Sequence, residues 1–158
     1  SLDIERDDVG LLKTCRELNV AIVCYSPLGR GMFGGQIKSP DDLDEGDRRR
    51  IMPRFSKENF PKNLQLVDQI TTLADKKGCT SGQLTLAWIL AQGDDFIPIP
   101  GTSKIKNLEE NIGAIEIELT QEEIQEIREA CEKADVAGGR SLEQMTAYLF
   151  GDSAPKKN

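Results

Sequence analysis

The stretch IPIPGTSKIKNLEEN, residues 97–111, joins an apolar, strand-like run to a helix through glycine, hydroxyl and lysine residues. The helix is expected at about 103–113, and the free N–H groups at its start favour an anion. Thr102 and Ser103 could donate hydrogen bonds to that anion, and Lys104 adds a formal charge. The stretch therefore predicts a phosphate site. The simpler alternative is a capped turn in which Thr102 or Ser103 is the N-cap.

A second apolar run followed by a glycine-rich loop lies earlier in the chain. VAIVCY, residues 20–25, precedes SPLGRGMFGG, residues 26–35, just as DFIPIP, residues 95–100, precedes the loop described above. Neither run alternates, so each predicts a parallel strand that is buried on both faces. Ligands of parallel α/β proteins bind beyond the carboxyl ends of the strands, so both loops are expected on one face. Neither loop has the glycine spacing of the dinucleotide fingerprint.

Helical periodicity fills most of the chain between these strands. It predicts helices at 7–18 and at about 57–77, and a helix capped by Thr80 with Gln83. A further helix is expected to be capped by Thr120 with Glu123 and to end at about 134. The predicted inward-facing apolar residues of the helix at 103–113 are Ile105, Leu108 and Ile112.

The remaining segments are irregular. Residues 36–55 form a long charged stretch that is read either as a lid or as a solvated excursion. A short last helix is expected to begin at Ser141, with Gln144 completing its capping box, before a frayed tail at 152–158.

The resulting order of helices and strands predicts an α/β fold with only two core strands. Two parallel strands cannot bury their own edges, and a closed (β/α)8 barrel needs eight strands. We therefore expect that another chain completes the sheet or that this chain is one part of such a barrel.

Composition excludes several classes of function. The 158 residues carry a net charge of −7, which argues against a broad nucleic-acid footprint. The sequence has no apolar run long enough to span a membrane and no signal peptide, so a cytoplasmic protein is expected. The four cysteines form no CxxC pair and are read as thiols. Because the chain has no histidine, a metal site and a Ser-His-Asp arrangement are not expected.

The motifs together resemble one family. CYSPLGRG, followed some seventy residues later by IPIPGTSKIKNLEENIGA, is similar to the carboxyl-terminal part of an aldo-keto reductase, above all to fungal and plant members. PRFSKENFPKNL, QLTLAWILAQG and IELTQEEI resemble the same family in the same order. The resemblance implies that residues 1–135 are the carboxyl-terminal part of a (β/α)8 barrel on its NADP-binding side. Residues 136–158 would then be a terminal helix and tail.

The resemblance also implies a function and a set of cofactor-binding residues. Aldo-keto reductases reduce aldehydes and ketones to alcohols with NADPH, so the expected cofactor is NADP and the expected partner is a small carbonyl substrate. Tyr25 would stack on the nicotinamide ring, and the loop that follows it would hold the pyrophosphate. The last strand and helix would bind the adenosine 2′-phosphate and adenine. The matching positions are Tyr25, Ser26, Pro27, Leu28, Gly29, Arg30, Gly31, Gly101, Thr102, Ser103, Lys104, Asn107, Glu110 and Asn111.

The sequence departs from the family in two ways. Many members have an arginine between positions 104 and 107, where this chain has Lys104 and Lys106, and lysine lacks a guanidinium that can stack on adenine. The family's catalytic Asp, Tyr, Lys and His match nothing here, so no catalytic residue is assigned. Two alternatives stay open: a non-catalytic module that binds a cofactor or a partner, and another barrel that binds a phosphorylated ligand or flavin.

Overall fold

A computed structural model of the chain describes residues 2–142 and 144–145. Its two strands, β1 (Ile22–Tyr25) and β2 (Phe96–Ile99), pair in parallel with Ile22 opposite Phe96 and Tyr25 opposite Ile99. The α-helices are α1 (Leu11–Glu17), α2 (Phe60–Lys77), α3 (Ser81–Leu90), α4 (Ile105–Ile112) and α5 (Gln121–Lys133). Short 3-10 helices are η1 (Leu2–Glu5), η2 (Gly29–Gly34), η3 (Pro40–Asp42), η4 (Arg48–Ile51), η5 (Pro53–Phe55) and η6 (Gly113–Glu116).

Local capping signals place the starts of α3 and α5 and the end of α2 correctly, whereas α2 begins at Phe60 rather than at about 57. Thr80 and Thr120 each form a complete capping box, with Gln83 and Glu123 respectively, as predicted. Gly78 ends α2 in the left-handed conformation, with φ of 76°. These signals are reliable because each depends on only a few consecutive residues.

The core consists of two clusters. One lies between α2, α3 and α5 and includes Ile70, Leu84 and Ile127. The other packs the segment that follows β1 against α2, with Ile37, Leu43 and Phe55 buried beside Phe60 and Val67 of α2. Residues 36–55 are therefore not a solvated excursion, because they contribute three side chains to the core.

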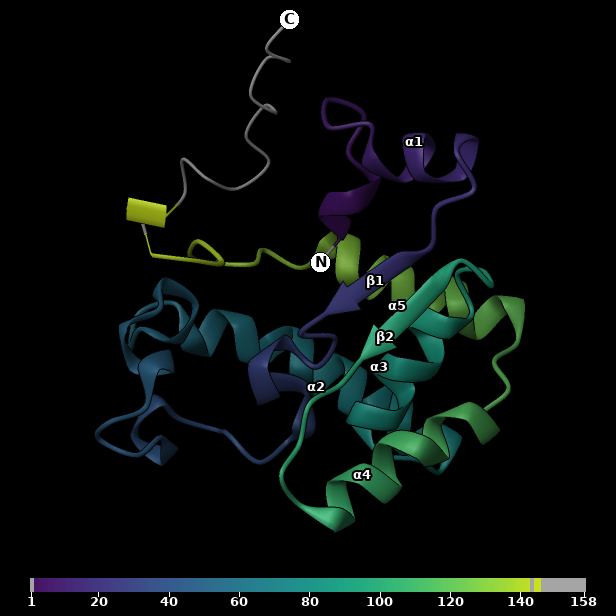
Figure 1. Cartoon of the computed structure of the whole chain (residues 1–158). Coiled ribbons are helices and arrows are strands. Elements are labelled where there is room, and N and C mark those ends of the chain that lie inside the picture. The colour runs from purple at the N-terminus through teal and green to yellow at the C-terminus, as the bar shows by residue number, and fades with distance from the viewer. Residues whose placement is uncertain (1, 143, 146–158) are drawn as a thin grey trace, which may run out of the picture.

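The expectation that both strands are covered on two faces is wrong. Ile22 and Phe96 are buried, whereas Val23, Tyr25, Ile97 and Ile99 on the opposite face are 46–58% exposed. In Figure 1 the two strands lie side by side and run in the same direction, with α3 behind β2. The apolar runs predict the two strands, but nothing in the described part of the chain covers their second face.

Two helical predictions also need correction. The helix predicted at 7–18 begins only at Leu11, after a left-handed Gly10, and none of its residues is buried. In α4 the apolar residues Ile105, Leu108 and Ile112 are 49–76% exposed, so they do not face a core here. The last helix, predicted to start at Ser141, falls mostly on residues outside those described.

Within the described residues, no helix is long and apolar enough to cross a membrane.

Candidate functional site

The carboxyl ends of the two strands bring the two glycine-containing loops to one edge of the sheet. Tyr25 pairs with Ile99, so the loop that starts at Ser26 and the loop that starts at Pro100 leave the sheet side by side. This confirms the expectation that both loops share a face, and the reason is the parallel pairing. The Tyr25 ring lies on the exposed face of the sheet at this edge.

The loop after β1 has an unusual backbone. Two of its non-glycine residues have positive φ angles, Ser26 at 50° and Arg30 at 58°. Such conformations cost about 1–3 kcal/mol each and persist where surrounding contacts hold them. Here the Arg49 guanidinium supplies one of those contacts, because its Nη1 donates to the Arg30 carbonyl oxygen at 2.9 Å.

Arg49 is itself held by Asp47. Its Nε donates to the Asp47 carboxylate at 3.0 Å, and the same carboxylate accepts the Arg49 backbone N–H at 2.8 Å. These hydrogen bonds lower the pKa of Asp47 from its ordinary 3.8 to about 2. The pair therefore stays charged at neutral pH, and it links the segment before η4 to the loop after β1.

The loop after β2 leaves the start of α4 open. Lys104 is the N-cap residue and makes no side-chain cap hydrogen bond, so the expectation that Thr102 or Ser103 would cap the helix is wrong. Instead the Thr102 hydroxyl accepts the Lys104 backbone N–H at 3.1 Å. Gly101, Thr102, Ser103 and Lys104 are all exposed. Lys104 has no carboxylate within 4.0 Å among the described residues, so its ammonium group is available to a ligand.

The remaining predicted positions lie along α4. Asn107 and Asn111 are half-buried and share a helical face with Lys104, because residues three and four apart lie above one another. Glu110 has a structural partner, since its carboxylate accepts the Thr80 hydroxyl at 2.7 Å. That hydrogen bond holds α4 against the start of α3.

The start of α3 lies between the first loop and α4. A Cβ added to Gly82 would lie 3.3 Å from the Glu110 carboxylate and 3.9 Å from a Leu28 methyl group. A larger side chain at position 82 would therefore push α4 or the first loop outward. The structure thus brings Leu28 and Glu110, predicted from different motifs, to the same glycine.

A third segment, which was not predicted to belong to the site, also reaches it. The guanidinium carbon of Arg140 lies 5.3 Å from the centroid of the Tyr25 ring, and Arg30 Nη1 donates to the Arg140 carbonyl oxygen at 2.7 Å. Nearby, Arg54 Nε donates to the Gly138 carbonyl oxygen at 3.3 Å. No local pattern in Gly-Gly-Arg at 138–140 indicates where this segment folds back.

Asn63 of α2 anchors this third segment. Its side-chain Nδ2 donates to the Ala137 carbonyl oxygen at 3.0 Å, and its Oδ1 accepts the Ala137 N–H at 2.9 Å. The same amide group donates to the Arg54 carbonyl oxygen at 3.0 Å. Only 5% of Asn63 is exposed, so each of these hydrogen bonds satisfies a buried group.

Other candidate chemistry is weaker. All four cysteines are free, and burial raises the pKa of the Cys24, Cys79 and Cys131 thiols. These three thiols are therefore poor nucleophiles at neutral pH. No group of side chains in the described residues could hold a metal ion.

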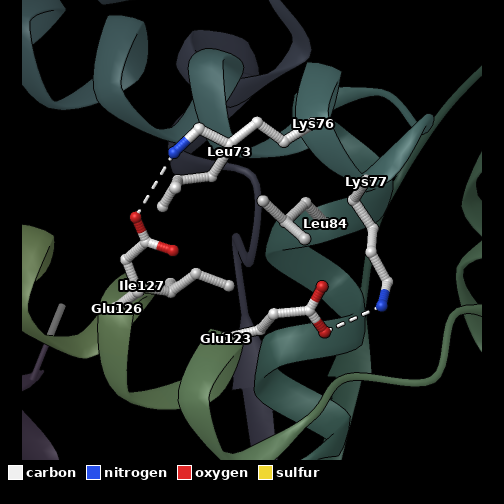
Figure 2. A pocket seen from close by; sticks show the side chains of 7 residues that line it. All are labelled: Leu73, Lys76, Lys77, Leu84, Glu123, Glu126 and Ile127. Carbon is white, nitrogen blue, oxygen red and sulfur yellow. Dashed lines mark hydrogen bonds and ion pairs between the residues drawn. The ribbon is translucent and has the colours of Figure 1, made fainter.

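A small pocket of about 80 Å³ lies between α2, α3 and α5 rather than at the loops. Figure 2 shows its walls, with Leu73, Leu84 and Ile127 between two ion pairs. Lys77 lies 2.7 Å from Glu123, and Lys76 lies 3.5 Å from Glu126. Because the lysine and glutamate side chains that line this pocket are paired with one another, they provide no net charge to attract a charged ligand.

Comparisons with known proteins show the family of the chain. A model of the aldo/keto reductase family matches residues 2–132. The chain belongs to the aldo/keto reductase family. It is 54% identical over 155 residues to the aldo-keto reductase yakc of Schizosaccharomyces pombe, which is designated an NADP(+) enzyme. It is 49% identical over 156 residues to the probable aldo-keto reductase 1 of Glycine max. Both alignments cover 98% of this chain.

The chain spans less than half the length of these relatives, 46% and 44% respectively. A glycerol dehydrogenase from Gluconobacter oxydans superposes on 86% of the chain with a TM-score of 0.73 and 26% identity, and 40% of that enzyme is covered. The fold is therefore that of the carboxyl-terminal portion of a (β/α)8 barrel, as expected from the sequence. The open second face of the strands agrees with a barrel of which the described residues supply only two strands.

Proposed function

We propose that this chain supplies the NADP(H)-binding part of an NADPH-dependent aldo-keto reductase that reduces aldehydes or ketones to alcohols. The observation that carries the proposal is the open start of α4, where exposed Lys104, Ser103 and Thr102 surround a helix N-terminus without a side-chain cap. A 2′-phosphate fits such a site, because backbone N–H groups, hydroxyls and an ammonium all favour a dianion. The name of the Schizosaccharomyces relative supports NADP.

The other predicted positions suit the rest of the cofactor. Tyr25 presents an exposed ring at the edge of the sheet, where it would stack on the nicotinamide. The loop Ser26–Gly31 would hold the pyrophosphate, while Asn107 and Asn111 would face the adenine. Glu110 would act indirectly, by fixing α4 through Thr80. When bound, NADPH supplies the hydride for carbonyl reduction. The residues of this chain bind and orient the cofactor, and the proton donor would come from outside it.

Lys104→Ala is the direct test of the proposal. One charge-assisted contact contributes about 1.5–3 kcal/mol, so the variant should bind NADPH about 10- to 150-fold more weakly. Binding of NADH, which lacks the 2′-phosphate, should change less than about twofold. Both dissociation constants are measured by calorimetric titration of this chain. Lys106→Ala is the matched control, because it removes the same charge from an exposed position two residues further on, on a different face of α4.

Equal losses for NADPH and NADH in Lys104→Ala would remove the phosphate assignment. A chain that binds neither dinucleotide would contradict the proposed function. It would favour the alternative of a partner-binding module, for which the exposed face of β1 and β2 is the supporting observation.

A further inference from the structure

Three arginine side chains from separate segments meet beside Tyr25. Arg30 comes from the loop after β1, Arg54 from η5, and Arg140 from the segment after α5. Arg30 donates to the Arg140 carbonyl oxygen at 2.7 Å, and Arg54 donates to the Gly138 carbonyl oxygen at 3.3 Å. The three residues are called the arginine cluster below. It is assembled by long-range contacts, 110 residues apart between Arg30 and Arg140.

The cluster concentrates positive charge in an acidic protein. The chain carries a net charge of −7, yet neither Arg30 nor Arg54 has a carboxylate within 4.0 Å in the described part of the chain. Arg140 pairs with Asp3 at 3.5 Å. Burial, and then the neighbouring Arg140, lowers the pKa of Arg54 below its ordinary value, whereas Asp3 acts in the opposite direction. Like charges that gather in a half-buried corner repel one another, and an anion would relieve that repulsion.

We propose that the arginine cluster binds an oxyanion group, carboxylate or phosphate, of the carbonyl substrate. Guanidinium groups match planar oxyanions through paired N–H donors. The cluster lies against the ring of Tyr25, with the Arg140 guanidinium carbon 5.3 Å from its centroid. The inference rests on the proposed function, in which the carbonyl would be reduced near this ring. It defines the substrates as acidic aldehydes or ketones.

The cofactor is a second source of oxyanions, and the structure favours the substrate. Only Arg30 belongs to the loop assigned to the pyrophosphate. Arg54 and Arg140 lie outside both predicted cofactor segments, and Arg140 stacks on Tyr25 itself. An anionic group held there would be next to the ring that is proposed to orient the nicotinamide.

The test uses the alcohols that carbonyl reduction would produce, because the aldehydes themselves can form imines with lysine side chains. The 15N-labelled chain is titrated with 4-(hydroxymethyl)benzoate, benzyl alcohol or inorganic phosphate, and the arginine Nε–Hε NMR signals are followed. The anionic alcohol should shift the signals of the cluster saturably, and benzyl alcohol should not. Phosphate should compete with the carboxylate, and the tighter of these two anions identifies the preferred group.

Variants locate the binding. Arg54→Gln and Arg140→Gln should each weaken binding of the anionic alcohol at least about fivefold, whereas Arg48→Gln, an exposed arginine in η4, should leave it unchanged. Arg54→Lys keeps the positive charge. It should therefore bind the anionic alcohol more tightly than Arg54→Gln if the affinity depends on the charge at position 54 rather than on side-chain packing. Amide spectra of every variant report whether the fold is intact.

Three results would overturn the proposal. The first is the absence of saturable shifts with either anion, and the second is equal affinity of Arg48→Gln and Arg140→Gln for the anionic alcohol. The third is displacement of the anionic alcohol by saturating NADP(+), which would assign the cluster to the cofactor's pyrophosphate. Failure of the chain to bind NADP(+) at all would count against the proposed function but not against the anion site, so the two failures are distinguishable.

Discussion

Replacing Gly138 with alanine should release the segment that carries Arg140 from the rest of the protein. Gly138 has a φ of 82°, and a Cβ added there would lie 2.7 Å from the Pro53 carbonyl carbon and 2.8 Å from the Asn59 side-chain nitrogen. The left-handed conformation costs an alanine about 1–2 kcal/mol, and crowding against a backbone atom adds about 1–3 kcal/mol. The total destabilisation of about 2–5 kcal/mol is at least as large as the stabilisation from the two Asn63–Ala137 hydrogen bonds, which contribute about 1 kcal/mol each.

Amide hydrogen exchange at Ala137 measures this release directly, because its N–H is bonded to Asn63 at 2.9 Å. A loss of 2 kcal/mol corresponds to about 30-fold faster exchange. Exchange at Cys79, whose N–H is bonded to Ala74 at the end of α2, should change far less.

Gly139→Ala is the matched control for Gly138→Ala. A Cβ at position 139 would meet its nearest atom, the Ser141 carbonyl oxygen, at 3.4 Å, and no left-handed φ is required. Equal exchange rates at Ala137 in the two variants would refute the reasoning and would mean that this segment is not held as described.

Three further predictions concern the edge of the sheet and its supports. Tyr25→Ala should weaken NADPH binding by about tenfold, whereas Tyr25→Phe should retain it, and calorimetry that finds Tyr25→Ala unchanged would exclude ring stacking. Asp47 has a pKa of about 2, below its ordinary 3.8, so it stabilises the fold above about pH 4 and loses that effect as the pH falls towards 2. Urea unfolding should therefore show the stability advantage of wild type over Asp47→Asn shrinking from pH 4 to pH 2, and a constant difference would contradict this. Thr80→Ala should lower the free energy of unfolding, measured with urea, by about 1 kcal/mol more than Thr120→Ala does. Both variants remove a capping box, but Thr80 also donates a hydrogen bond to Glu110. Equal losses would mean that the Glu110 contact adds nothing to stability.

The parts of the fold that the sequence predicts well are those that neighbouring residues determine. The capping boxes at Thr80 and Thr120 lie where they were predicted, and both strands follow their apolar runs. The apolar stripe of α4 is also visible in the sequence, but the prediction that it faces inward is wrong. Periodicity shows which side of a helix is apolar, whereas burial depends on whether something in the same chain packs against it.

The candidate site also has one part that the sequence predicts and another that it does not. Parallel pairing of β1 and β2 follows from their apolar, non-alternating sequences, and it places Tyr25 and the start of α4 at a common edge. The contributions of Arg140 and Asn63 could not be predicted, because Asn63 meets a segment 74 residues later through backbone groups that every residue has. Such contacts leave no pattern in the sequence.

The exposed face of β1 and β2 has a consequence for how the stability of this chain should be measured. A molecule that covers Val23 and Ile97 binds the folded state and not the unfolded one, so it stabilises the fold by mass action. Well above its dissociation constant, each tenfold rise in its concentration adds about 1.4 kcal/mol to the free energy of unfolding. A melting temperature of this chain is therefore defined only together with the concentration of whatever occupies that face, including other copies of itself.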